Sequence, residues 1–514
     1  MAQTFEDLTR EVVHRFLQNI LFVDDNAYQN DKEENAFDAS EISSVFAQRG
    51  ILCTVYAPHH ENDIVNCKPL FAKADVAVID WYLKLDKEQQ EMDGEADAET
   101  EEPRGVYTIK LINNIIEDAS DKKLKLVVIY TGETDLTGIT EELFKETAQY
   151  GNFQQGDCCV FSSNIMILVR AKYKEESQFK HNEELRSKIV KYEDLPDFIT
   201  VEFSKMVNGI MPIFALTAIF NIREQTSKIL RIYSNEIDYA YLGHRVLLEN
   251  QRDAYHMLQK VFGESMSDLI VYSNSKMDDW ISLWIDNRFP EPKTTTIGSK
   301  PITVDKNVLK ELLSNSAESY KDKISRLFKG DLTNKEAMGN STCLFSTNEE
   351  VATSSNVKFA ILTHHKNVFG VQSGRPFLTL GTVVSHDEEY YVCIQQRCDS
   401  VRLKAERRFL FLPLTNKDSN IHVLINNNHR LNVSDLTYAL KTIIFIPHEG
   451  EDCIFAKEVG DELENKKYVF ESKYGEEYEW VLELKDLQAQ RIVDAYCSKL
   501  SRVGLDESEW LRLL

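Results

Sequence analysis

Short apolar runs alternate with amphipathic segments along the first third of the chain. The runs are predicted to be buried β-strands, because each is short, continuous and bounded by polar residues or glycine. The segments between them repeat apolar residues at helical spacing and are predicted to be α-helices. The expected strands are residues 20–24, 51–57, 74–83, 125–133 and 164–172, and the expected helices are residues 41–50, 105–118 and 139–151. This alternation is typical of a parallel sheet covered by helices on both faces, so the region is predicted to be α/β.

The pattern changes twice beyond this region. Residues 176–290 repeat apolar positions at helical spacing and are predicted to be a helical region. A stretch rich in Pro, Thr, Ser and Lys, residues 288–307, is interpreted as a linker. Helical pieces and then alternating strands follow, so an α+β C-terminal domain is predicted, with a short capped helix near Asp506 at its end. The predicted organisation is three domains, residues 1–175, 176–290 and 291–514.

An acidic insertion separates the third expected strand from the helix that follows it. Residues 84–104 consist mostly of acids and small polar residues, with little apolar surface to bury. We interpret this segment as a disordered or mobile surface insertion. Solvation is its simplest role, and a steric or electrostatic gate over the nearby strand ends is the alternative.

The composition argues against two classes of binding partner, nucleic acids and membranes. The formal net charge of −24 argues against a nucleic-acid surface, which requires a basic patch. The longest apolar stretch, residues 206–220, contains Gly209 and Pro212, so it predicts a buried helix with a break and not a membrane span. The N-terminal segment lacks an apolar signal-peptide core, and nine cysteines without framework spacing suit a reducing compartment. We therefore expect a cytoplasmic protein without nucleic-acid or membrane partners.

Polar side chains follow the expected parallel strands at their carboxyl ends, where ligands bind in doubly wound sheets. These residues are Asp24 and Asp25 after the first strand, Asp80 after the third, Thr131 at the end of the fourth, and Arg170 and Lys172 on the fifth. Carboxylates hold Mg²⁺, which neutralises a phosphoryl group while one carboxylate attacks phosphorus. A hydroxyl and a cation can bind the remaining phosphoryl oxygens. The set therefore predicts phosphoryl chemistry at one edge of the sheet.

This ordered set resembles the receiver domain of bacterial two-component response regulators. The resemblance implies a flavodoxin-like, doubly wound parallel sheet and a bound Mg²⁺. It implies metal ligands at Asp24, Asp25 and Asp80, with the backbone carbonyl of Tyr82 as a further ligand. The run "DWYL", residues 80–83, fits the family's Asp-x-x-Met/Leu pattern.

The same resemblance implies the phosphoryl-handling groups. Asp80 would be the phosphoacceptor, Thr131 the switch hydroxyl and Lys172 the cation that faces the phosphoryl group. The sequence lacks the proline usual after the "DWYL" run and the Lys-Pro usual after the fifth strand, so Arg170 is the alternative cation. The interval from Thr131 to Lys172 is also longer than a minimal receiver needs.

The resemblance implies an atypical response regulator that is phosphorylated by a partner histidine kinase and signals through contacts of its C-terminal region with an effector protein. Receivers joined to large α+β regions are found in bacterial stress-signalling and anti-phage operons. One alternative is a pseudo-receiver scaffold, or phosphate sink, without a phosphorylation switch. Another is an enzyme site in the C-terminal domain that uses Cys398 and Asp399, with His386 or His422 as base. Beyond self-phosphorylation and dephosphorylation, no enzyme activity is expected of the receiver.

Overall fold

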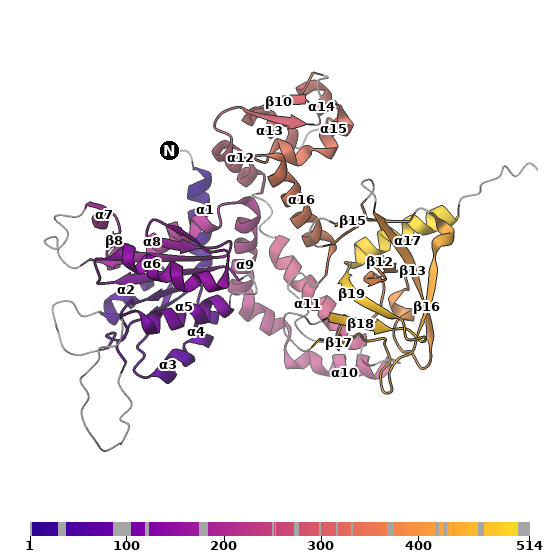
Figure 1. Ribbon diagram of the computed structural model, residues 1–514, viewed down its shortest axis with the longest axis horizontal. Coiled ribbons are helices and arrows are strands. Elements are labelled where there is room, and N and C mark those ends of the chain that lie inside the picture. Colours follow the sequence, from indigo (N-terminus) through magenta and orange to yellow (C-terminus); the bar gives the residue numbers. More distant parts are fainter. Residues whose placement is uncertain are drawn as a thin grey trace, which may run out of the picture. The chain divides into compact units, whose positions relative to one another are not determined.

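A computed structural model gives the fold of the chain, coloured along the sequence in Figure 1. It describes residues 3–28, 38–85, 104–118, 123–173, 183–248, 251, 253–271, 277–297, 300–314, 317–329, 333–366, 375–416, 421–425, 429–434, 436–460 and 467–501. The chain divides into two compact units, residues 1–290 and 291–514. Each unit is described by itself.

An eight-stranded sheet forms the centre of the first unit, in the order β2-β1-β3-β4-β7-β6-β5, with β8 beside β7. Five of its parallel strands are β1 (Asn19–Val23), β2 (Leu52–Tyr56) at one edge, β3 (Val76–Ile79), β4 (Lys125–Thr131) and β7 (Ile165–Lys172). All five were predicted. The strand order reverses beside β1, as it does in a doubly wound sheet. The predicted α/β fold is therefore confirmed for this part of the chain.

Three short strands were not predicted, namely β5 (Gln154–Gly156), β6 (Cys159–Phe161) and β8 (Ile189–Val190). The β5–β6 hairpin lies between α6 and β7, and β6 runs antiparallel to β7. It extends the sheet by two strands at this edge. The hairpin therefore accounts for the long interval between Thr131 and Lys172.

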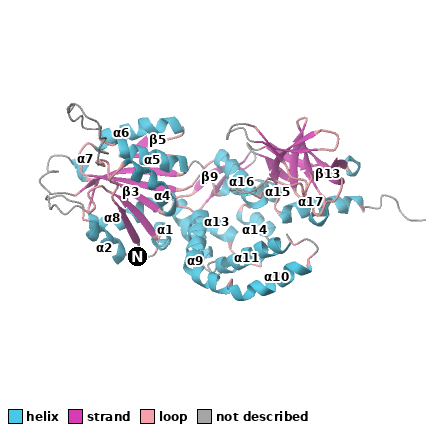
Figure 2. Ribbon diagram, turned by 90° about the horizontal axis from the view of Figure 1, so that it is seen from below, coloured by secondary structure: helices cyan, strands magenta, loops and turns pink. Residues whose placement is uncertain are grey.

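Helices cover both faces of this sheet (Figure 2). One face packs against α3 (Glu61–Asn66), α4 (Lys68–Lys73), α5 (Val106–Asp118) and α6 (Leu136–Thr147). The other face packs against α1 (Phe5–Phe16), α2 (Ala39–Gln48), α8 (Leu195–Met206), α9 (Ile210–Ile232) and α12 (Met277–Arg288). Helices α3 and α4 were not predicted, because each is only six residues long.

The second buried cluster extends well beyond the α/β sequence region. It joins Phe22 of β1 to Phe203 of α8 and to Trp280 of α12. The predicted domain boundary near residue 175 stays a prediction, although side chains from both of its sides share this cluster.

The apolar stretch at residues 206–220 is broken as expected. Helix α8 ends at Met206, and α9 begins at Ile210 with Gly209 as its N-cap residue. Within the described residues, no helix is long and apolar enough to cross a membrane. The remaining helices of this unit are α7 (Glu183–Arg186), α10 (Asp238–Leu247) and α11 (Asp253–Val271).

The second unit begins with a β-hairpin, where the sequence was interpreted as a linker. Strands β9 (Lys293–Ile297) and β10 (Lys300–Val304) pair antiparallel. The linker interpretation was wrong for these residues. It gave weight to Pro and Lys, whereas the β-branched residues Thr294, Thr295 and Thr296 favour extended backbone.

Helices and a nine-stranded antiparallel sheet complete this unit, which confirms the predicted α+β class. The helices are α13 (Lys306–Leu313), α14 (Tyr320–Leu327), α15 (Asn334–Gly339), α16 (Glu349–His364) and α17 (Asp486–Leu500). The strands are β11 (Thr382–His386), β12 (Glu389–Cys393), β13 (Arg407–Asn416), β14 (Val423–Ile425), β15 (His429–Val433), β16 (Lys441–Phe445), β17 (Lys457–Val459), β18 (Lys467–Glu471) and β19 (Glu477–Glu483). The predicted short helix near Asp506 and residues 86–103 of the acidic insertion lie outside the described residues.

Candidate functional site

Parallel strand pairing brings the first and third strand ends together. Val23 and Ile79 are partners in the register of β1 and β3, so the next residues, Asp24 and Asp80, leave the sheet side by side. The main-chain N–H of Asp80 donates to the carbonyl of Val23 (2.9 Å), which extends the ladder by one bond. The backbone therefore fixes the relative position of these two aspartates.

Three carboxylates gather at this edge. Asp24, Asp25 and Asp80 each offer an oxygen atom, and these three oxygens lie within 4.8 Å of one another. Asp24 and Asp25 are buried, and Asp80 is nearly so. No other group of three or more His, Cys, Asp or Glu side chains approaches this closely among the described residues. Hard oxygen donors at this spacing fit Mg²⁺, which prefers oxygen ligands and usually keeps several waters.

Lys172 is the cation that contacts the cluster. Its Nζ lies 2.7 Å from Asp24 Oδ2 and 3.2 Å from Asp80 Oδ2. The alternative cation, Arg170, points elsewhere, because its guanidinium donates to the carbonyl of Cys158 (3.2 Å) and lies over the ring of Phe198. Both residues belong to β7, and only the lysine bridges the first and third strand ends.

Burial and mutual repulsion perturb the cluster. Burial, followed by the charge of Asp24, raises the pKa of Asp25 to about 6. Burial also raises the pKa of Asp80 to about 7, although Lys172 acts in the opposite direction. For Lys172, burial acts to lower the pKa, but Asp80 and Asp24 outweigh it and the pKa lies above its usual value. One ammonium therefore faces more negative charge than it can neutralise, and a bound divalent cation would relieve the excess.

Main-chain donors orient the acidic pair at the end of β1. The N–H of Asn26 donates to Asp24 Oδ1 (3.0 Å), as in an Asx turn. The N–H of Lys84, in the loop after β3, donates to Asp25 Oδ2 (3.3 Å). This explains why a buried strand can end on two adjacent acids. The turn satisfies part of their hydrogen-bonding capacity, and their remaining oxygens face the cluster.

The loop after β3 is held by the start of α5. The Thr108 hydroxyl donates to the main-chain carbonyls of Asp80 (2.7 Å) and Trp81 (3.0 Å). Gly105 has a φ of +86°, and a Cβ there would lie 2.2 Å from the indole of Trp81. Thr108 and Trp81 support the position of Asp80 and were missed in the sequence. Gly105 directly before the helix was the available signal.

Thr131 and Tyr82 occupy the same edge. Thr131 is the buried last residue of β4 and is paired with Ala171, the neighbour of Lys172. Its hydroxyl accepts a hydrogen bond from the Glu133 N–H (3.1 Å). Tyr82 is half-buried, and Arg104 lies over its ring at 5.4 Å. The roles of Thr131 as a switch and of the Tyr82 carbonyl as a metal ligand stay predictions.

The proposed cysteine site in the second unit gains no geometric support. Cys398 is exposed in a short 3-10 helix, and Asp399 accepts a hydrogen bond from Gln395 (3.3 Å). Among the described residues, no contact joins Cys398 to His386 or His422. The nucleophile–base pair that such chemistry needs is therefore not assembled there.

Residues 16–177 match a family model described as a response receiver domain. The predicted resemblance is thereby confirmed for the N-terminal part, about a third of the 514-residue chain. No curated protein and no solved structure matches the chain. A receiver indicates two-component, response-regulator-like signalling, with interaction with histidine kinases or effectors, and receivers typically bind Mg²⁺ through acidic residues.

Proposed function

We propose that this protein is an atypical response regulator that accepts a phosphoryl group on Asp80 from a partner histidine kinase. The bridge from Lys172 to both Asp24 and Asp80 carries this proposal. These contacts bring the proposed acceptor carboxylate, a proposed metal ligand and a cation together at the end of the sheet where ligands bind.

In the proposed reaction, a carboxylate oxygen of Asp80 attacks the phosphorus atom of a phosphohistidine. An O–P bond forms and gives an acyl phosphate on Asp80. The P–N bond breaks, and the imidazole leaves with the electron pair of that bond. Mg²⁺ held by Asp24, Asp25 and Asp80 would neutralise charge on the phosphoryl oxygens. The raised pKa of Asp80 reflects burial and neighbouring acids, so ionisation of the attacking carboxylate depends on added positive charge.

Lys172 has two roles in this proposal. Before transfer it compensates Asp24 and Asp80. After transfer its ammonium can pair with a phosphoryl oxygen in place of the Asp80 carboxylate. Thr131, at the end of the adjacent strand, is proposed to move inward and donate its hydroxyl to another phosphoryl oxygen, which would draw its oxygen away from the Glu133 N–H. That exchange would move the loop after β4 and alter contact with effector proteins.

Incubation with acetyl phosphate and Mg²⁺ tests the proposal. We expect one hydroxylamine-sensitive phosphoryl group on the wild-type protein by intact-mass measurement, and none on Asp80→Asn. Asp75→Asn is the matched control, because Asp75 is also buried and paired with a cation, Arg223, but lies before β3 at the other end of the sheet. Equal labelling of wild type and Asp80→Asn would contradict the assignment. No labelling of either would favour the pseudo-receiver alternative.

A further inference from the structure

The end of α9, helix α10 and the first part of α11 form a helical extension, defined here as the described residues 230–248, 251 and 253–262. Two of its helices contact each other at Tyr233, whose ring packs edge-on against that of Phe262 with the ring centroids 5.4 Å apart. The Tyr233 hydroxyl also lies 3.1 Å from Ser265 Oγ. Within α10 no residue is buried, and among the described side chains of α11 only Ala254 is. The helices of the extension therefore contact one another but bury almost no side chains.

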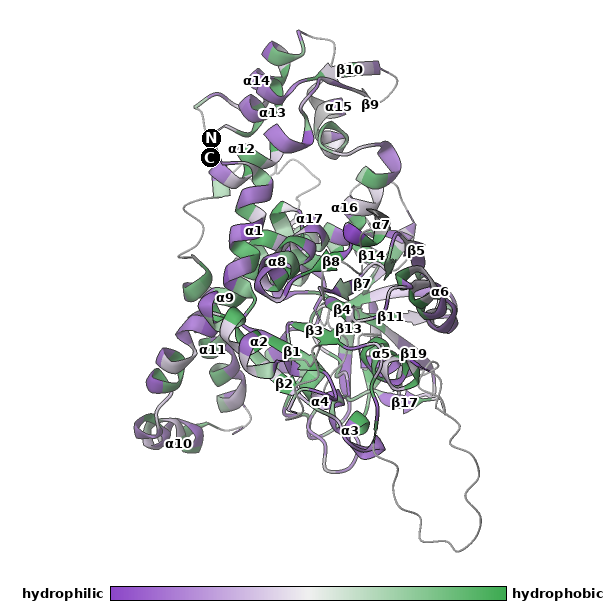
Figure 3. Ribbon diagram, turned by 90° about the vertical axis from the view of Figure 1, so that its left-hand side faces the viewer, coloured by the Kyte–Doolittle hydropathy of each residue, from purple (hydrophilic) through white to green (hydrophobic). Residues whose placement is uncertain are grey.

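Large apolar side chains cover this extension. Tyr239, Val246 and Leu247 of α10 are 83%, 74% and 84% exposed. The full set of exposed large apolar residues in the extension is Leu230, Ile232, Ile237, Tyr239, Leu242, Val246, Leu247, Tyr255, Met257, Val261 and Phe262. Figure 3 shows hydrophobic and hydrophilic residues interspersed along these helices. Tyr239, Leu242 and Val246 recur at i, i+3 and i+7, so they share one face of α10.

A ten-residue helix with no buried side chain is marginal in water, because packing of an apolar face supplies most helical stability in proteins. Gly243 weakens α10 further, since a mid-helix glycine costs roughly 1 kcal/mol relative to alanine. Gly243 lies on the face of Tyr239 and Leu242 and has open space beside it. A partner surface on this face would stabilise the helix, and the glycine would let the partner approach closely.

The charge of the extension favours one kind of partner. Three basic residues balance three acidic ones among the described residues of the extension, whereas the whole chain carries −24. The basic residues are Arg231, Arg245 and Lys260, and the acidic ones are Glu236, Asp238 and Asp253. Two copies of so acidic a chain repel each other over most of their surface but not here. An isologous contact brings the same patch of two copies together, and a patch without net charge allows this without electrostatic repulsion.

We propose that the helical extension pairs with the same surface of a second copy of this chain, so that two helix pairs form an intermolecular bundle. The eleven exposed side chains carry on the order of 1,000 Å² per copy, so an interface of the roughly 800 Å² per partner that specific complexes bury would have to cover most of them. This inference is independent of phosphorylation, since none of its residues belongs to the acidic site.

Sedimentation equilibrium of the full chain tests the pairing with two matched variants. Val246→Glu places a charge on the extension, and Val65→Glu places the same charge on α3, where Val65 is similarly exposed at 67%. We expect the wild type and Val65→Glu to be dimers with similar dissociation constants. The dissociation constant of Val246→Glu should be at least tenfold higher. Asp80→Asn should dimerise like wild type, which separates this result from the fate of the proposed function.

Two outcomes would overturn the pairing. One is a wild-type chain that stays monomeric at high concentration, which would mean that the extension is covered within the chain or by another protein. The other is a dimer that Val246→Glu and Val65→Glu weaken equally. Circular dichroism of both variants excludes misfolding, and Leu247→Glu provides a second substitution with the same expected effect.

Discussion

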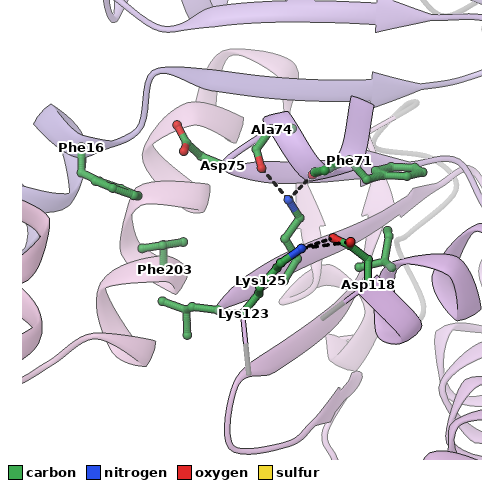
Figure 4. A pocket seen from close by; sticks show the side chains of 11 residues that line it. Phe16, Phe71, Ala74, Asp75, Asp118, Lys123, Lys125 and Phe203 are labelled. Carbon is green, nitrogen blue, oxygen red and sulfur yellow. Dashed lines mark hydrogen bonds and ion pairs between the residues drawn. The ribbon is translucent and has the colours of Figure 1, made fainter. Parts of the chain in front are cut away.

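Two largely buried lysines at opposite ends of the same sheet have different surroundings. Lys172 ends β7 and contacts the carboxylates of Asp24 and Asp80. Lys125 begins β4, and its Nζ donates to the main-chain carbonyls of Phe71 and Ala74, beside a cavity of about 150 Å³ (Figure 4). Lys172 is paired directly with two carboxylates, whereas the hydrogen bonds of Lys125 go to main-chain carbonyls.

The pKa values follow this difference. Burial lowers the pKa of Lys125 to about 8, and the nearby Asp75 opposes the shift only in part. Asp75 is itself paired with Arg223 at 2.8 Å. At Lys172, burial acts in the same direction, but two carboxylates reverse the result. The acidic cluster therefore keeps a buried ammonium charged, which is what a site for phosphoryl oxygens needs.

The largest expected effect comes from removing each lysine in turn. Lys172→Met leaves Asp24 and Asp80 buried without their cation, which should cost about 3–5 kcal/mol of unfolding free energy without Mg²⁺. Lys125→Met leaves two carbonyls without a donor and should cost about 1–3 kcal/mol. Urea unfolding of the first unit measures both. Equal losses would show that carboxylates and dipoles compensate a lysine equally well.

Removing one acid at each end of the sheet should change the stability of the protein in opposite directions. Asp25 has a pKa raised to about 6, so Asp25→Asn should stabilise the metal-free protein near neutral pH by about 1–3 kcal/mol. Asp75→Asn breaks the pair with Arg223 and should destabilise it by a similar amount. Thermal unfolding compares the two. Destabilisation by both substitutions would contradict the excess of negative charge at the carboxyl end.

The smallest expected effect is the pH dependence of stability and of its increase by Mg²⁺. Folding raises the pKa values of Asp25 and Asp80 above the usual 3.8, to about 6 and about 7. These groups therefore favour the folded state below about pH 4, and that contribution is lost as the pH rises through 6 and 7. Mg²⁺ binds the ionised acids, so the rise in melting temperature that it causes should be larger at about pH 8 than at about pH 5. A rise independent of pH would exclude binding at these acids.

The strands of the two units differ in how well the sequence predicts them. Strands β1, β3, β4 and β7 were predictable, because a strand buried on both faces is a continuous apolar run, as in residues 125–131. Strand β2 lies at the edge of the sheet and is only partly buried, but its residues Leu52–Tyr56 are also mostly apolar. The short strands β5 and β6 were not predictable, since exposed Gln154 and Gln155 give no apolar pattern. The hairpin β9–β10 was missed for the same reason, because alternate residues such as Thr294 and Thr296 are exposed.

The acidic site could be predicted from strand ends, because parallel strands deliver their last residues to one edge. The choice between Arg170 and Lys172 could not. Both side chains lie on the same strand two residues apart and so point to the same face, and only the surrounding contacts decide which one reaches the carboxylates. The supporting bond from Thr108 to the Asp80 carbonyl is likewise invisible in the sequence, since it depends on how α5 meets β3.

Mapping the phosphorylated residue tests the central claim most directly. An acyl phosphate on aspartate is reduced by borohydride to homoserine, which peptide mass spectrometry locates. After treatment with acetyl phosphate and Mg²⁺, we predict homoserine at position 80 and aspartate retained at positions 24, 25 and 75. Homoserine at any of those other positions, or at none, would contradict the assignment of Asp80 as the phosphoacceptor.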